Sequence, residues 1–108
     1  MPTLVFAKFA INDHAGYSRY VELATPIFVR EKVIIHASDE NPQALSSDMQ
    51  ADKVVLLEFR DHSHFKHFFS QSDYIEAAKI RDAASTISAT VLNDLRCQSN
   101  LFTISLKF

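Results

Sequence analysis

The chain has 108 residues, 47% of them hydrophobic, and its formal net charge is −2 at pH 7. This length allows one domain with one core, and the slight acidic excess disfavours binding to nucleic acid, because phosphate contacts need clustered Lys and Arg. The single glycine, Gly16, and the single cysteine, Cys97, exclude glycine-rich phosphate loops and a disulfide framework within the chain.

The apolar stretches are all shorter than the roughly 20 residues that a membrane-spanning helix needs, so no membrane partner is expected. The amino terminus lacks the charged and apolar segments of a signal peptide. Since a lone cysteine also fits a reducing compartment, the sequence predicts a cytoplasmic protein.

The first third of the chain predicts a strand followed by a helix. Residues 3–11 alternate between two faces and are rich in β-branched and aromatic side chains, which is typical of a strand. Asn12 or Asp13 can cap the helix that follows, whose apolar residues recur at spacings of three and four to about Glu31. Because proline has no N–H group, Pro26 predicts a kink or break in this helix near Thr25.

The next segments predict further strands and helices. Residues 33–37 predict a short strand, and after a polar loop the apolar run Lys53–Phe59 predicts a central strand. Asp61 or Ser63 can cap a first helical segment, a second one starts near Ser72, and residues 86–92 return to strand character.

The order strand-helix-strand, strand-helix-strand over residues 1–94 is that of the ferredoxin-like, split βαβ fold. It predicts an α+β domain in which a four-stranded antiparallel sheet carries its helices on one face. The other face has apolar residues and nothing in the chain to cover it, so a homodimer with two-fold symmetry is expected.

Residues 95–108 form a C-terminal extension beyond this order. Their last part alternates in hydrophobicity and predicts an extra strand, whose buried side would consist of Phe102, Ile104, Leu106 and Phe108. We expect this strand to pair within the subunit or with the partner.

Three stretches of the sequence resemble the DUF1330 family, a set of small proteins of unknown function. They are Asp13–Tyr20 (DHAGYSRY), Val54–Phe59 (VVLLEF) and Ser72–Tyr74 (SDY), the last with Arg81 seven residues after Tyr74. The resemblance covers roughly residues 3–94 and implies a dimeric α/β barrel, but no assigned reaction. Related barrels include monooxygenases, isomerases, haem-degrading proteins and stress proteins without catalytic activity. The glycine pairs that often flank the second strand in the family are absent here.

His36 and Tyr20 are the candidate catalytic residues. His36 ends an apolar strand, and on the sheet face toward the helices its imidazole could act as acid or base near neutral pH. The alternative is a half-buried histidine that bonds a backbone carbonyl. Tyr20 lies one turn from Tyr17 on the predicted helix. A phenol there can donate to a substrate oxygen if it reaches a cavity, although such pairs also serve simply as core.

Tyr17, Glu58, Tyr74 and Arg81 are the candidate substrate-binding residues. Arg81 could bind an anion through its planar set of donors. Glu58 interrupts an apolar strand, so the alternative role of Arg81 is an ion pair with Glu58 that fastens a helix to the sheet.

Three histidines, His62, His64 and His67, lie close together but match no metal-ligand signature. We expect them on a solvent-exposed helix face, because the neighbouring phenylalanines claim the inward face, and we expect no metal and no other cofactor. Cys97 has no histidine nearby in the sequence to activate its thiol as a nucleophile.

These observations leave two functional hypotheses. In the first, each subunit of a dimer binds a small, partly aromatic or anionic molecule in a cleft between helices and sheet, and cofactor-free acid/base chemistry such as isomerisation or oxygenation is the compatible reaction class. In the second, the protein is a non-catalytic dimeric module of structural or stress type. A cavity large enough for a ligand, with His36 and Arg81 converging on it, would favour the first.

Overall fold

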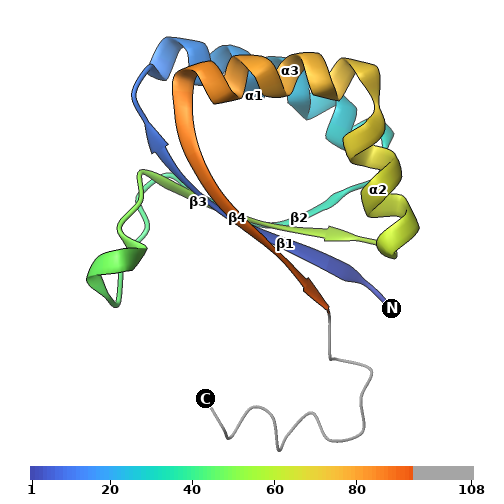
Figure 1. The fold of residues 1–108 in the computed structure, drawn as a ribbon, viewed down its shortest axis with the longest axis horizontal. Helices are drawn as coiled ribbons and strands as arrows, with labels where there is room; N and C mark the ends of the chain where they lie inside the picture. The colour runs from blue at the N-terminus through green and yellow to red at the C-terminus, as the bar shows by residue number, and fades with distance from the viewer. Residues whose placement is uncertain (94–108) are drawn as a thin grey trace, which may run out of the picture.

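The computed structural model describes residues 1–93. The strands form one antiparallel sheet in the order β2-β3-β1-β4, and the α-helices lie together on one face of it (Figure 1). The elements in chain order are β1 (Thr3–Ile11), α1 (His14–Arg30), β2 (Ile34–Asp39), the 3-10 helix η1 (Ser47–Met49), β3 (Lys53–Phe59), α2 (His62–Ser70), α3 (Ser72–Ala84) and β4 (Ser85–Asn93). This arrangement confirms the predicted α+β fold.

Both ends of helix α1 have hydrogen bonds to backbone groups that lack a partner within the helix. Asp13 caps the amino end, where its carboxylate accepts a hydrogen bond from the Gly16 N–H at 3.1 Å. After the carboxyl end the chain turns through Lys32, which takes the positive φ of 58° that glycine adopts most readily. The Lys32 N–H then donates to the Val29 carbonyl and closes the turn.

Of the predicted kink or break near Thr25, the break is wrong, because α1 continues through Pro26 to Arg30, close to the predicted end near Glu31. Pro26 is exposed and removes one backbone hydrogen bond, the one that its missing N–H would give to the Glu22 carbonyl. The buried side of the helix extends past this position, so packing holds the helix together across the proline. That side consists of Tyr17, Tyr20, Ala24 and Ile27.

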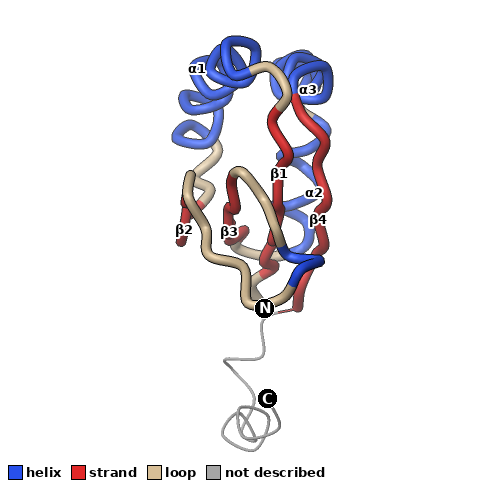
Figure 2. The backbone as a smooth tube through the Cα atoms, turned by 90° about the vertical axis from the view of Figure 1, so that its left-hand side faces the viewer, coloured by secondary structure: helices blue, strands red, loops and turns tan. Residues whose placement is uncertain are grey.

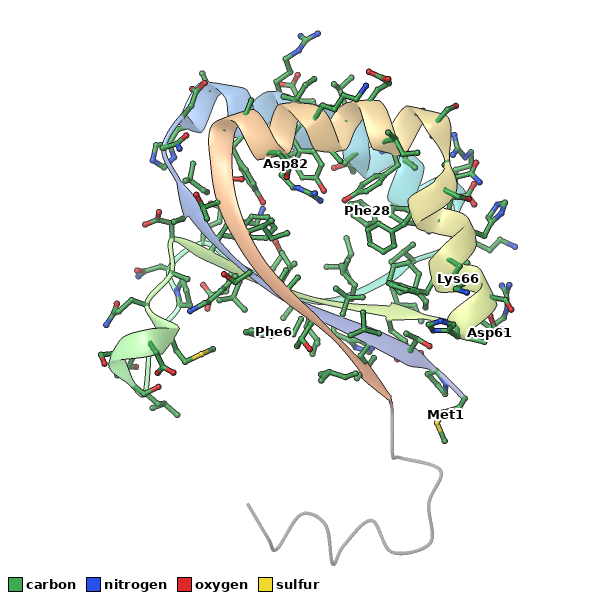
Figure 3. The ribbon with its side chains drawn as sticks, in the orientation of Figure 1. Met1, Phe6, Phe28, Asp61, Lys66 and Asp82 are labelled. Atoms are coloured by element: carbon green, nitrogen blue, oxygen red, sulfur yellow. The ribbon has the colours of Figure 1, made fainter. Side chains whose placement is uncertain are left out.

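The pairing register divides the side chains of the sheet into two faces. The inner face looks toward the helices, and its members from β1 and β3 are Val5, Ala7, Phe9, Lys53, Val55, Leu57 and Phe59. The outer face, which no α-helix of residues 1–93 covers, carries Leu4, Phe6, Lys8, Val54, Leu56 and Glu58 from the same strands. Figure 3 shows Phe28 between helices and sheet and Phe6 on the opposite side of the sheet.

Strand β2 is longer than the sequence predicts and is irregular. A β-bulge between Ile35 and Ala37 inserts His36 as an extra residue against β3. The bulge leaves Ile35 opposite Leu57 and Ser38 opposite Val55, so both Ile35 and Ser38 belong to the inner face although they are three positions apart.

Helices α2 and α3 begin where the sequence predicts. Asp61 caps α2 by accepting a hydrogen bond from the His64 N–H at 2.8 Å, and α3 starts at Ser72. The end of α3 packs tightly on the start of α1, since a Cβ on Gly16 would lie 3.1 Å from the Ala84 Cβ. The one glycine of the chain therefore stands where two helices meet.

The predicted C-terminal strand and Cys97 lie outside the described residues. Within residues 1–93, no helix combines the length and the hydropathy that crossing a membrane requires.

Candidate functional site

A cavity of about 370 Å³ lies between the helices and the inner face of the sheet. Most of its lining is aliphatic or aromatic. Ile35 and Ser38 line it from β2 and are themselves exposed, so the cavity reaches solvent beside that edge strand. Figure 2 shows β2 below α1. Seven of the lining residues carry polar groups, namely Tyr17, Tyr20, Thr25, Ser38, Lys53, Tyr74 and Arg81.

Three of these residues form one hydrogen-bonded group, which we call the Arg81 cluster: Arg81, Tyr74 and Tyr20. Arg81 and Tyr74 share a face of α3 because they are two helical turns apart. Arg81 Nη1 donates to Tyr74 Oη at 2.9 Å, and Tyr74 Oη lies 2.9 Å from Tyr20 Oη on α1. The Arg81 guanidinium also lies over the Tyr20 ring, with Cζ 5.7 Å from the ring centroid.

The hydrogen atoms of the Arg81 cluster leave donors available for a ligand. The bond between Tyr20 and Tyr74 uses one of their two phenolic hydrogens, whichever of the two donates. Of the five N–H groups of Arg81, one goes to Tyr74 and two reach the Asp82 carboxylate at 3.1 Å. Among the described residues, the cluster therefore keeps one O–H and two N–H groups without a hydrogen-bond acceptor.

Burial sets the charges of the cluster. Tyr74 is 4% exposed, and this burial, reinforced by Tyr20, raises its pKa and keeps the phenol neutral. Burial by itself works against the charge of Arg81, but the oxygens of Tyr74, Tyr20 and Asp82 outweigh that effect and raise the Arg81 pKa. The cluster is thus a cation that lies between two phenols and the Asp82 carboxylate and keeps N–H and O–H groups for a negatively charged oxygen.

Tyr17 and Lys53 extend the polar lining beyond the cluster. The Tyr17 ring lies 5.7 Å from the Tyr20 ring, and Lys53 Nζ lies 4.9 Å from the centroid of the Tyr17 ring. Burial is the main cause of the raised pKa of Tyr17 and of the lowered pKa of Lys53. Four of the predicted site residues thus come together at this cavity, namely Tyr17, Tyr20, Tyr74 and Arg81. Lys53 also lines the cavity and was not predicted as a site residue.

His36 and Glu58 lie apart from the other predicted site residues. His36 Nε2 lies 2.7 Å from Glu58 Oε1, and Glu58 belongs to the outer face of the sheet, so this pair faces away from the cavity. His36 and Arg81 therefore do not converge on one cavity, and the catalytic role of His36 and the binding role of Glu58 stay predictions. The predicted ion pair between Glu58 and Arg81 is wrong, because β3 points Glu58 to the face opposite the helices and Arg81 pairs with Asp82.

Of the three histidines of α2, His62 and His67 are exposed as expected, whereas His64 is buried, contrary to the expectation. His64 is 6% exposed, its Nδ1 accepts a hydrogen bond from the Arg60 N–H, and its Nε2 donates to the Glu31 carbonyl at 2.6 Å. His67 lies on the surface, with Nε2 3.3 Å from a Glu31 carboxylate oxygen. No group of three or more potential metal ligands occurs within residues 1–93.

The chain can now be compared with known proteins. The family model of a domain of unknown function, DUF1330, matches residues 2–95. The chain belongs to the DUF1330 family. No curated protein matches the sequence significantly. For this DUF1330 protein, membership confirms the resemblance found in the sequence and assigns no reaction.

Solved structures confirm the ferredoxin-like fold of this DUF1330 protein. A protein of unknown function from Rhodopseudomonas palustris is 19% identical with a TM-score of 0.76, over 88% of this chain and 83% of that chain. A dimeric ferredoxin-like protein of unknown function from Jannaschia sp. CCS1 is 12% identical with a TM-score of 0.69, over 87% and 100%. A cofactor-independent oxygenase from Streptomyces nogalater is 14% identical with a TM-score of 0.62, over 91% and 97%. At these identities the likeness concerns the fold alone.

Proposed function

We propose that this protein is a homodimer that binds a small aromatic anion in the cavity of each subunit, with the anionic oxygen at the Arg81 cluster. The observation that carries the proposal is the convergence of Arg81, Tyr74 and Tyr20 on a largely apolar cavity of about 370 Å³. Pockets of this size, apolar with few polar groups, are typical of small-molecule sites.

The cluster has the chemistry of an oxyanion site. A guanidinium and a spare phenolic O–H, held by their own hydrogen bonds, would stabilise a carboxylate, phenolate or enolate oxygen without rearrangement. Enolate-type intermediates are common to cofactor-free isomerisation and oxygenation, and one structural neighbour is described as a cofactor-independent oxygenase. This neighbour makes such chemistry worth testing in the present protein.

One observation favours the alternative, a binding module without catalysis. The residues that line the cavity include no carboxylate and no imidazole, so the customary general bases are missing from the described part of its wall. Exchange of the acidic α-hydrogens of 2-tetralone in deuterium oxide distinguishes the two cases. Exchange above the buffer rate, lost in Arg81→Met, supports catalysis, whereas exchange at the buffer rate supports the binding module.

Dimerisation is proposed through the outer face of the sheet. Leu4, Phe6, Val54 and Leu56 put apolar side chains there without a helix to cover them. A second copy related by a two-fold axis would bury this face against an identical one. Neighbours of this fold from Jannaschia sp. CCS1 and from Thermobifida fusca are described as dimeric.

Calorimetric titration with 2-naphthoate tests the binding site. We expect the wild type to bind 2-naphthoate at least about tenfold more tightly than the neutral 2-naphthamide, because a charge-assisted hydrogen bond contributes about 1.5–3 kcal/mol. Arg81→Met and Tyr74→Phe should each remove most of this preference. Arg60→Met is the matched control, since the Arg60 side chain is 70% exposed and pairs with Asp61 outside the cavity. Equal binding of both probes by the wild type would contradict the proposal.

A further inference from the structure

Lys53 is a buried cation on the inner face of the sheet. It begins β3, pairs with Phe9 of β1, and is 7% exposed, the same fraction as the apolar inner-face residue Leu57 four positions later. Lysine is almost never buried to this degree unless its charge is paired. Its place therefore needs a reason other than packing.

The ammonium of Lys53 has no anionic partner among the described residues. Its one specific contact is the Tyr17 ring, with Nζ 4.9 Å from the ring centroid, and no hydrogen bond or ion pair joins Lys53 to another group of residues 1–93. Burial lowers the Lys53 pKa, and the charge of Glu40 offsets this in part. Lys53 lines the cavity, and its ammonium has N–H groups that could donate to an anion there.

Lys53 and the Arg81 cluster stand at two ends of one aromatic surface. The Tyr17 and Tyr20 ring centroids are 5.7 Å apart and the rings are inclined at 53°; Lys53 lies over the Tyr17 ring, and Arg81 Cζ lies 5.7 Å from the centroid of the Tyr20 ring. All four residues line the cavity. A molecule lying along the two tyrosines would meet a cation at each end and apolar side chains between them.

We infer that Lys53 is a second anchor of the cavity and that its ligand is a flat aromatic molecule with two acidic oxygen groups, one at each end. This inference rests on the proposed function and narrows it from an aromatic anion to an aromatic dianion. The Lys53 ammonium holds the second carboxylate or phenolate, while the Arg81 cluster holds the first. The opening beside Ile35 and Ser38 admits the ligand.

The test compares 2,6-naphthalenedicarboxylate with 2-naphthoate by calorimetry on the full chain. The wild type is expected to prefer the diacid at least about tenfold, as one further charge-assisted hydrogen bond predicts. Lys53→Met should abolish this preference, because the affinity for the diacid should fall at least about tenfold more than the affinity for 2-naphthoate. Lys53→Arg, which keeps the charge, should retain part of the preference. Lys79→Met is the control, since Lys79 lies on the surface of α3 beside Glu76.

Each outcome decides a separate point. An equal preference for the diacid in wild type and Lys53→Met would overturn the role of Lys53 and leave the Arg81 site standing. Loss of 2-naphthoate binding in Arg81→Met, together with loss of only the diacid preference in Lys53→Met, supports both anchors. If the wild type binds neither probe, the proposed function fails, and the second anchor fails with it.

Discussion

Lys53 and Arg81 are two cations that line the same cavity but have different partners. Arg81 is surrounded by the oxygens of Tyr74, Tyr20 and Asp82, whereas Lys53 has an aromatic ring as its neighbour. A cation of the first kind stabilises the fold around it. A cation without an anionic partner, such as Lys53, lowers the stability of the fold until a ligand binds. Binding sites commonly contain groups that lower stability in this way.

Replacing Lys53 should therefore stabilise the protein. Burial lowers the pKa of Lys53 in the folded protein below 10.5, its ordinary value in the unfolded chain. At a pH between the folded and the unfolded pKa, the unfolded chain therefore binds more protons than the folded chain. The stability of the protein rises with pH in that window. Lys53→Met should unfold at a higher temperature than the wild type at neutral pH, and its stability should no longer rise with pH in that window. Thermal melts from pH 7 to 11, with Lys79→Met as control, measure both effects. A lower melting temperature for Lys53→Met at neutral pH would show that the ammonium stabilises the fold.

The sequence predicted those site residues that lie on helices, because helical spacing determines which residues share one side of a helix. Tyr20 lies one turn after Tyr17, and Arg81 two turns after Tyr74, so each pair had to share a side of its helix. His36 was not predictable in this way, because the apolar residues on both sides of it give β2 no alternation to indicate which face looks inward. Lys53 was missed because a charged residue at the start of an apolar strand usually marks the strand end at the surface.

At the scale of elements, a single imidazole joins the end of α1 to the start of α2. His64 accepts a hydrogen bond from the Arg60 N–H through Nδ1 and donates to the Glu31 carbonyl through Nε2, which fixes one neutral tautomer. Sequence periodicity found both helices but not this connection, since a residue 33 positions away supplies the acceptor. Nor did it show that the apolar face of α1 would outweigh Pro26.

Removing this imidazole should loosen the packing of α2. His64→Leu leaves the Arg60 N–H and the Glu31 carbonyl without their partner, and at about 1–3 kcal/mol for each buried group we expect a loss of about 2–4 kcal/mol in stability. His67→Leu is the control, since its imidazole is 61% exposed. Urea unfolding gives both values. A loss in His64→Leu no larger than that in His67→Leu would show that the two backbone groups find other partners.

At the scale of the whole molecule, helices cover one face of the sheet and leave the other with apolar side chains. Phe6 lies near the middle of this outer face, opposite Leu56 of β3 and Thr90 of β4 (Figure 3). The sequence order alone predicted both the fold and the uncovered face, because the ferredoxin-like topology follows from the order of strands and helices. The cavity could not be predicted, because its volume depends on how closely α1 and α3 approach the sheet.

A charge on the outer face should prevent dimerisation. The wild type is expected to elute with a mass of about twice 12.3 kDa in size exclusion with light scattering, and Phe6→Glu with the mass of a monomer, because two buried carboxylates would face each other across the interface. Val29→Glu places the same charge on an exposed position of α1 and should remain dimeric. A monomeric wild type at micromolar concentration, or a dimeric Phe6→Glu, would contradict the proposed interface.

The central claim is that the cavity beneath α1 and α3 receives an acidic aromatic molecule at the Arg81 cluster. A crystal structure of the protein grown with 2-naphthoate tests it most directly. The claim predicts the naphthalene ring beside Tyr17 and Tyr20, with a carboxylate oxygen within about 3.2 Å of the Arg81 guanidinium or of a Tyr20 or Tyr74 hydroxyl. A cavity closed by its own side chains, or 2-naphthoate bound elsewhere on the protein, would contradict it.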